Sequence, residues 1–423
     1  MVSISTEKIH RDFESARETY LSYGVDVDKV LVEFRNIPIS LHCWQGDDVR
    51  GFENVGDVAN QNLVTGNYPG AARNGDELRS DIDMAFGLSP CRHRVNLHSI
   101  YAEPRRPTPR NELVTEDFRE WIDWARMKGL GLDFNASFFT HPMMVDGFSL
   151  SSRRKDVRDY WVKAGIGARE ISRDIGRELG NRCVNNIWIP DGMKDMPANR
   201  RLYREHLIDS LDRILESSHD RTYMVDVLEG KLFGIGLESF TVGSHEFYLA
   251  YASSRKGVGI CMDTGHYHPT ESVVDKISSV ALLVEDILLH ISRGIRWDSD
   301  HVLIQGDDLS NLMLELKRGR FFDQVAMGLD YFDASINRVA AWAIGLRAAG
   351  RALLRALLEP SDLLEKAESQ GDYTGRLALM EEFANLPVQA VWDSLCLDTG
   401  VPVGIGMLDA IRLYEQEVLL NRR

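Results

Sequence analysis

The 423-residue sequence predicts an α/β fold, a closed parallel (β/α)8 barrel of the TIM type followed by a C-terminal helical extension. Eight short and nearly continuous apolar runs occur within the first 331 residues, and stretches with apolar residues at helical spacing separate most of them. Runs that are apolar throughout are typical of parallel strands covered by helices on both faces, and eight strands alternating with helices match this barrel. The runs occupy residues 37–45, 94–100, 130–136, 183–190, 223–229, 258–264, 287–293 and 325–331.

An open, doubly wound sheet is the alternative arrangement of the same elements. Such sheets often bind dinucleotides through a Gly-x-Gly-x-x-Gly turn after the first strand, but no such turn follows residues 37–45. The helical pattern between the runs is clearest over residues 201–217, RLYREHLIDSLDRILES. The missing turn weakens the dinucleotide-binding interpretation, and the open sheet remains the alternative to the closed barrel.

Two further regions complete the predicted organisation. Residues 46–71 form a long Gly- and Asn-rich loop, which we expect to be a mobile lid. From about residue 335 the pattern is wholly helical, and NRVAAWAIGLRAAGRALLRALLEP predicts a long amphipathic helix ended by Pro360. We therefore expect a barrel over residues 1–334, with an N-terminal helix, and a helical extension over 335–423 that packs on the barrel or on a neighbouring subunit.

Composition and charge exclude several classes of protein. A net charge of −15 lacks the basic footprint that nucleic acid binding requires. The N-terminus has no apolar signal region, and no run of roughly 18 uncharged apolar residues could span a membrane. Five scattered cysteines without a Cys-x-x-Cys pair fit a reducing compartment. We expect a cytoplasmic protein that acts on a small molecule.

Reactive side chains follow the last four apolar runs. Polar residues at the carboxyl ends of barrel strands converge on one face, where active sites lie. Taken singly, each residue has an ordinary interpretation: a core histidine, a helix cap, a solvated turn or a surface lysine. The residues are Glu229 and Lys231 after the fifth run, Asp263 and His266 after the sixth, His290, Asp298 and Asp300 on or after the seventh, and Asp330 after the eighth.

Together these residues predict a metal site. Carboxylates buried together without compensation cost several kcal/mol each, so a divalent cation is their natural partner. Carboxylates mixed with imidazoles suit Mn²⁺, Mg²⁺ or Co²⁺ better than a thiolate zinc site. One ion would take Asp263 and His266 with Asp298 and Asp300. A second ion would take the acidic and imidazole residues of four successive strands, with Asp263 bridging the two: Glu229, Asp263, His290 and Asp330.

Long motifs in the same order over nearly the whole chain resemble bacterial L-rhamnose isomerase, one of the xylose isomerase-like, metal-dependent aldose–ketose isomerases. The motifs are LHCWQGDD (41–48), TGNYPG (65–70), LGLDFN (130–135), NIWIPDGMKD (186–195), KLFGIG (231–236), YHPT (267–270), RWDSDH (296–301) and GLDYFDASINR (328–338). The resemblance implies a barrel with Mn²⁺ and a second divalent ion, a homotetramer, and conversion of L-rhamnose to L-rhamnulose, the first step of L-rhamnose degradation.

The resemblance also assigns roles to residues. It implies that Glu229, Asp263, His290 and Asp330 hold a structural ion, and that His266, Asp298 and Asp300, with Asp263 bridging, hold a catalytic one. Lys231, Asp298 and Asp330 are the implied catalytic residues. The residues implied beside the sugar are Trp44, His98, Trp188 and Lys231. One departure concerns NQNL at residues 60–63, where the family's lid would offer an apolar residue to the far end of the sugar.

The chemistry leaves alternatives open. Because the pocket's acids and imidazoles are committed to metal, we expect a metal-assisted hydride shift between C2 and C1, with tryptophan walls excluding water. The rival hypotheses are a two-metal barrel hydrolase, an isomerase of another aldose such as L-mannose, L-lyxose or D-allose, and a sugar-binding protein without activity. A hydrolase of phosphates would need more basic residues than Lys231 at the strand ends, and a binding protein would not need seven metal ligands.

Overall fold

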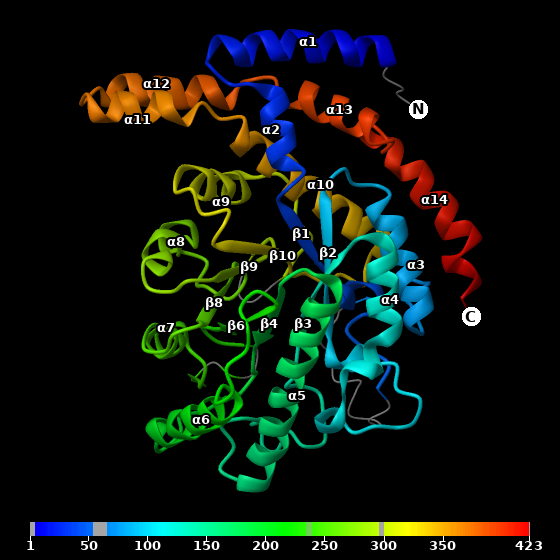
Figure 1. The fold of residues 1–423 in the computed structure, drawn as a ribbon, viewed down its shortest axis with the longest axis vertical. Coiled ribbons are helices and arrows are strands. Elements are labelled where there is room, and N and C mark those ends of the chain that lie inside the picture. Colours follow the sequence, from blue (N-terminus) through cyan, green and yellow to red (C-terminus); the bar gives the residue numbers. More distant parts are fainter. Residues whose placement is uncertain (1–4, 54–65, 235–236, 238, 296–299, 423) are drawn as a thin grey trace.

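The computed structural model describes residues 5–53, 66–234, 237, 239–295 and 300–422. Its centre is a closed barrel of eight parallel strands, as predicted (Figure 1). Around the barrel the strands follow chain order, and the last one pairs with the first. The strands are β1 (Pro38–His42), β2 (Arg92–His98), β3 (Gly131–Asn135), β4 (Cys183–Ile187), β6 (Met224–Glu229), β8 (Val258–Asp263), β9 (Ile287–Ile291) and β10 (Val325–Leu329).

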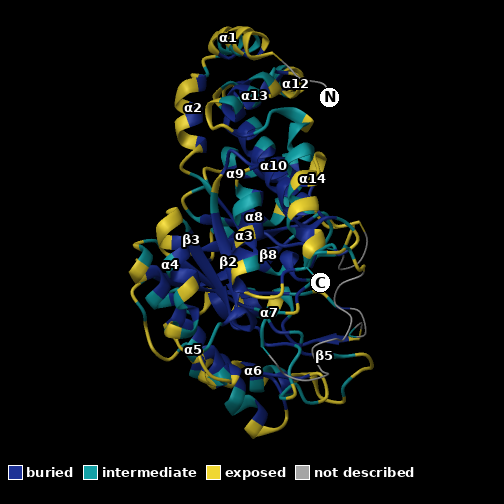
Figure 2. Ribbon diagram, turned by 90° about the vertical axis from the view of Figure 1, so that its right-hand side faces the viewer, coloured by how far each residue is buried: buried dark blue, intermediate teal, exposed yellow. Residues whose placement is uncertain are grey.

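A helix follows each barrel strand and covers the outside of the barrel. Strands buried by helices on one side and by the barrel interior on the other are largely apolar, which explains the nearly continuous apolar runs. Figure 2 shows β3 and β8 coloured as buried, whereas the surrounding helices also present exposed faces. The helices are α3 (Gly75–Phe86), α4 (Arg119–Lys128), α5 (Lys155–Leu179), α6 (Arg200–Ile214), α7 (His245–Ser253), α8 (Val274–Ala281), α9 (Asp307–Arg318) and α10 (Arg338–Leu357).

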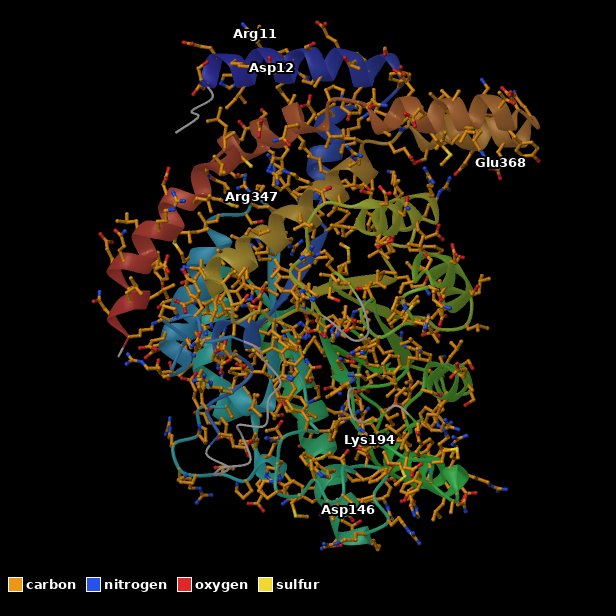
Figure 3. The ribbon with its side chains drawn as sticks, turned by 180° about the vertical axis from the view of Figure 1, so that it is seen from behind. Arg11, Asp12, Asp146, Lys194, Arg347 and Glu368 are labelled. Atoms are coloured by element: carbon orange, nitrogen blue, oxygen red, sulfur yellow. The ribbon has the colours of Figure 1, made fainter. Side chains whose placement is uncertain are left out.

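Most of the remaining helices gather at one end of the molecule. In Figure 1, α1, α11, α12 and α13 lie above the barrel, and α14 runs down beside α3. Helix α1 packs on α13, and α11 and α12 form a hairpin. In Figure 3, Arg11 and Asp12 mark this end and Asp146 marks the opposite one. The bounds are α1 (Thr6–Ser22), α2 (Val27–Phe34), α11 (Ser361–Ser369), α12 (Tyr373–Ala384), α13 (Val388–Asp398) and α14 (Met407–Glu417).

Helix α10 differs from the amphipathic helix that the sequence predicts. It packs against both α9 and α3, and nearly all of its residues are buried. Arg347 can be buried because its guanidinium donates to the carbonyl oxygens of Leu88 (2.9 Å) and Pro402 (3.1 Å) (Figure 3). The helix therefore lacks the solvent-exposed polar face expected of an amphipathic helix, because its arginines are buried or half-buried. The division of the chain at residues 334 and 335 stays a prediction.

The barrel interior is layered. At the amino ends of the strands, Arg94 of β2 pairs with Asp133 of β3, with Nη2 2.7 Å from Oδ1, and both are buried. A small apolar cluster made by Val184, Val225, Val227, Cys261 and Leu288 lies in a separate layer. The amino-terminal face of such barrels serves stability, which leaves the carboxyl ends for function.

The predicted lid is described only at its two ends. Its first part leaves β1 through a 3₁₀ turn over Cys43–Gly46, and Ala72 N donates to Gly46 O (2.9 Å) where the loop returns. Tyr68 N donates to Ala334 O (2.8 Å), which ties the loop to the segment after β10. Residues 54–65, including the NQNL stretch, lie outside the described residues, so the lid remains a prediction. Across the helices of the described part, none has the length and apolar character needed to cross a membrane.

Candidate metal centre

Four of the predicted ligands meet at the carboxyl ends of four neighbouring strands. Glu229 ends β6, Asp263 ends β8, His290 lies in β9, and Asp330 directly follows β10. The register pairs Asp263 with His290, so these two side chains stand at the same level of the barrel. All four are buried, and one ligand atom from each lies within 4.8 Å of the other three. We call these four residues the first ligand set.

His290 lies at the centre of the first ligand set. Its Nδ1 is 3.1 Å from Asp330 Oδ2, 3.2 Å from Glu229 Oε2 and 3.8 Å from Asp263 Oδ2. Asp263 Oδ2, Asp330 Oδ1 and both ring nitrogens of His290 are buried without a hydrogen bond to any group in the described part of the chain. Burying so many unsatisfied polar atoms costs several kcal/mol. The oxygen and nitrogen donors therefore fit a divalent cation.

The acidic groups and imidazoles perturb one another strongly. Burial and the nearby carboxylates Asp300, Asp330 and Glu229 raise the pKa of Asp263 well above its usual value, although His266 opposes this. Burial also disfavours ionised Glu229, but the imidazoles of His290 and His266 outweigh it and hold its pKa well below the usual value. The acids and imidazoles of the cluster are thus strongly coupled, and a bound divalent cation would favour their deprotonated, metal-binding forms.

The remaining predicted ligands lie beside this set. His266 Nδ1 is 3.1 Å from Glu229 Oε1, and its Nε2 is 3.9 Å from Asp263 Oδ2. Asp300 Oδ1 accepts from Ser292 Oγ (3.2 Å). Asp298 lies outside the described residues, so its place in this second ligand set (Asp263, His266, Asp298 and Asp300) is still a prediction.

Gly265 marks the point where the two ligand sets converge. A Cβ at this position would collide with Asp300 Oδ1 and lie 3.3 Å from Asp263 Oδ1. The glycine amide donates to Asp263 Oδ1 (2.7 Å), which orients that carboxylate. The absence of a side chain at Gly265 thus lets the Asp300 carboxylate lie against the backbone beside Asp263, and a larger residue would displace it.

Aromatic residues form the wall beside the carboxylates. Trp44 stacks on His98 with ring centroids 4.4 Å apart, and Phe139 contacts Trp188 at 5.6 Å. Lys231 Nζ lies 5.2 Å from the Trp188 ring centre, and the Trp188 ring is 6.4 Å from that of His266. Three of the four residues expected beside the sugar, Trp44, His98 and Trp188, thus lie next to the ligand sets. The fourth, Lys231, lies over the ring of Trp188.

Polar atoms on this wall are available to a ligand. The indole Nε1 atoms of Trp44 and Trp188 and Nε2 of His98 are buried and have no hydrogen-bond partner among the residues described. The other ring nitrogen of His98, Nδ1, lies 3.3 Å from Ser137 Oγ. An apolar wall with a few unsatisfied donors and acceptors is typical of a small-molecule site.

Two residues close to the first ligand set were not predicted. His42 ends β1, and its ligand atom lies within 4.8 Å of those of His290 and Asp330. Cys261 forms a similar group with Glu229 and His290. Cys261 lies two residues before Asp263 on one strand, and side chains with that spacing share a face. That spacing was the available signal for Cys261, whereas His42 lay unnoticed inside the motif LHCWQGDD.

The fold and this cluster define the class of the protein: a (β/α)8 barrel enzyme with a candidate metal centre at the carboxyl ends of its strands. The sequence model of the L-rhamnose isomerase family, RhaA, matches residues 7–422. The chain therefore belongs to the L-rhamnose isomerase family.

Two sequence relatives support the same assignment. L-rhamnose isomerase of Rhodopirellula baltica is 52% identical over 98% of this chain and 97% of its own length. L-rhamnose isomerase of Yersinia pseudotuberculosis is 49% identical over 99% of this chain and 100% of its own length. A solved structure of L-ribulose 3-epimerase is 15% identical, covers 78% of this chain and 96% of that chain, and has a TM-score of 0.47.

Proposed function

We propose that this chain interconverts L-rhamnose and L-rhamnulose as a divalent-metal-dependent aldose–ketose isomerase. The observation that carries the proposal is the first ligand set, in which four neighbouring strands bury acids and an imidazole with unsatisfied atoms. Membership of the L-rhamnose isomerase family supports the choice of sugar. A two-metal hydrolase of phosphates is disfavoured because Lys231 is the one obvious cation among the residues singled out at the strand ends.

The two ligand sets would each hold one ion. Glu229, Asp263, His290 and Asp330 would hold the structural ion, and His266, Asp298 and Asp300 with Asp263 would hold the catalytic one. Mixed oxygen and nitrogen ligands favour Mn²⁺, with Co²⁺ or Mg²⁺ as alternatives. When bound, such ions polarise the sugar carbonyl and stabilise negative charge on its oxygens.

The protein groups position the sugar and control its protons. Lys231 would donate a hydrogen bond to O1 at the mouth of the second ligand set, and Asp298 would move the proton between O1 and O2. His98 would form a hydrogen bond with a sugar hydroxyl through Nε2, because Nδ1 already lies 3.3 Å from Ser137 Oγ. Asp330 acts by holding the cluster in place around the reacting end of the sugar.

The hydrogen itself would move directly from C2 to C1 as a hydride. The imidazoles and carboxylates next to the pocket contact one another at 3.1 to 3.9 Å, so they are poorly placed to act as a free base at C2. Trp44 and Trp188 would keep water from the reacting carbons. Direct transfer therefore suits this site better than an enediol route.

The cellular setting follows from the same proposal. We infer a homotetramer in the cytoplasm that binds neither nucleic acid nor membrane. The negative net charge disfavours nucleic acid. Apolar side chains exposed on α12 and α14 support assembly, because they would otherwise face water: Tyr373 (62% exposed), Leu377 (65%) and Leu413 (54%).

The direct test is an activity assay with metal-free protein. The full chain is stripped with a chelator, reloaded with Mn²⁺ and incubated with L-rhamnose, and the ketose is measured. We expect L-rhamnulose only after reloading. L-mannose, L-lyxose and D-allose are compared at equal concentration, and a phosphodiester tests the hydrolase. Full activity in excess chelator would exclude the metal mechanism, and faster turnover of another aldose would reassign the substrate.

A further inference from the structure

His42 has a fixed tautomer. It is the last residue of β1, it is 1% exposed, and its Nδ1 lies 2.9 Å from Leu329 O. A carbonyl oxygen only accepts hydrogen bonds, so Nδ1 must carry a hydrogen and donate it. In the neutral ring the lone pair then lies on Nε2. A metal-ligating histidine is commonly held in this way, with its other nitrogen donating to a backbone carbonyl.

The free nitrogen of His42 points toward the first ligand set. Nε2 is 3.8 Å from Asp330 Oδ1, and neither atom has a hydrogen-bond partner in the described part of the chain. The His42 and His290 rings meet edge to face with centroids 4.7 Å apart. A separation of 3.8 Å is too long for a direct hydrogen bond. Two buried acceptors therefore face each other across a gap without a donor.

A cation would satisfy both acceptors at once. Divalent ions bind imidazole nitrogen and carboxylate oxygen at about 2.0–2.2 Å, so two ligands of one ion can lie about 3.8 Å apart. The ligand atoms of His42, His290 and Asp330 all lie within 4.8 Å of one another, and all three residues are buried. This group shares two members with the first ligand set.

We propose that His42, through Nε2, is a further ligand of the ion held by His290 and Asp330. This inference rests on the metal centre proposed above and adds a residue to it. Leu329, whose carbonyl fixes the His42 tautomer, immediately precedes Asp330, and β10 pairs with β1 at Leu329 and Leu41. The ion would therefore join the first and last strands where the barrel closes.

A second imidazole also changes which ions the site prefers. Nitrogen ligands favour borderline ions such as Co²⁺ and Zn²⁺ over Mg²⁺ and Ca²⁺, which prefer oxygen. We therefore expect the ion at this position to be retained when Mg²⁺ is supplied in excess. The ion of the second ligand set, with three carboxylates and one imidazole, exchanges more readily.

The variant His42→Asn tests the roles of the two ring nitrogens separately. The asparagine amide nitrogen can occupy the place of Nδ1 and keep the bond to Leu329 O, while nothing replaces Nε2. The control is His93→Asn, the same change at a histidine whose ring stacks on Phe86 at 4.2 Å and whose Nε2 is likewise buried and unpartnered within the described residues. His93 lies near the amino end of β2, away from the ligand sets.

The experiment measures metal binding in the full chain. Chelator-stripped protein is titrated with Co²⁺ against a chromophoric chelator, and the visible spectrum of bound Co²⁺ is recorded. We expect His42→Asn to lower the affinity for one of the two ions by about 10- to 100-fold and to change the visible spectrum of bound Co²⁺. His93→Asn should bind like the wild type, and the thermal midpoint of metal-free His42→Asn should stay near the wild-type value.

Two outcomes would overturn the proposal. If His42→Asn binds both ions with wild-type affinity and spectrum, His42 is not a ligand. If it lowers the midpoint of metal-free and loaded protein equally, its role is structural. If His42→Asn does not fold, His42→Ala, which offers no ligand atom at the position of Nε2, is titrated in the same way and judged by the same results. A wild type that takes up no ion would instead refute the proposed function itself.

Discussion

Replacing Asp330 with asparagine should reduce thermal stability mainly when metal is present. In the metal-free protein, Asp330 attracts His290 (Nδ1 to Oδ2, 3.1 Å) but repels Glu229 within the same buried cluster. Removing its charge therefore has opposing effects on the metal-free fold. In the loaded protein the same change removes a ligand, so the stabilisation from ion binding falls.

The magnitude follows from linkage. A ligand that binds only the folded protein stabilises it by RT ln(1 + [L]/Kd), so a 100-fold loss of affinity removes about 2.7 kcal/mol at saturating metal. The entropy of unfolding is about 2.1 cal/mol/K per residue, or roughly 0.9 kcal/mol/K for a chain of this length. We therefore expect the midpoint of the loaded variant to fall by about 3 °C more than that of the metal-free variant.

The assay is calorimetry of wild type, Asp330→Asn and Asp133→Asn, each with and without Mn²⁺. Asp133 is the matched control, because it is a buried barrel carboxylate that pairs with Arg94 at the opposite ends of the strands. Breaking that pair should cost about 3–5 kcal/mol whether or not metal is bound. If Asp330→Asn behaves like Asp133→Asn, with equal losses in both states, Asp330 does not hold an ion.

Three further predictions concern pH, the lysine and a strained residue. Burial opposes charge on His266, but Asp263 and Glu229 outweigh it and raise the pKa of His266 to about 9. The stabilisation from this proton is fully present below pH 6.5, the pKa of histidine in the unfolded chain, and is lost as pH rises through about 9. The thermal midpoint of the metal-free protein should therefore fall over this pH range. A midpoint that does not change with pH would contradict this prediction. Lys231→Met should lower kcat/KM about 100-fold with metal content unchanged, whereas lost metal would assign Lys231 to the ion site. Arg320→Gly should raise the free energy of unfolding by roughly 0.5–1 kcal/mol in denaturant titration, because exposed Arg320 has a φ of 59°; an unchanged value would show that this conformation costs little.

The strands were predictable because burial on both faces leaves a strong signal. Seven of the eight barrel strands begin and end inside their predicted runs, and β2 begins two residues early at Arg92. That start was missed because Arg92 and His93 are polar, with Arg92 exposed and His93 only half-buried. The two-residue strands β5 (Gly192–Met193) and β7 (Phe240–Thr241) are too short to leave any periodicity.

The candidate site was predictable where charge interrupts an apolar run. Glu229, Asp263 and Asp330 stood out because a carboxylate at a strand end is costly without a partner. His42 did not stand out, because a histidine within a run that is apolar on both sides gives no sign of whether it faces the barrel interior. Only the closure of β1 on β10 places His42 beside Asp330.

The measurement that tests the proposed chemistry most directly uses L-rhamnose carrying deuterium at C2. Mn²⁺-loaded protein converts the labelled sugar in ordinary water, and the product is analysed by mass spectrometry after a single turnover. We expect L-rhamnulose with the deuterium retained at C1, because the hydrogen moves directly between the two carbons in a pocket walled by Trp44 and Trp188. Substantial loss of deuterium to water would contradict the hydride shift and point to an enediol base such as His98. Failure to form any ketose from metal-loaded protein would contradict the isomerase assignment as a whole.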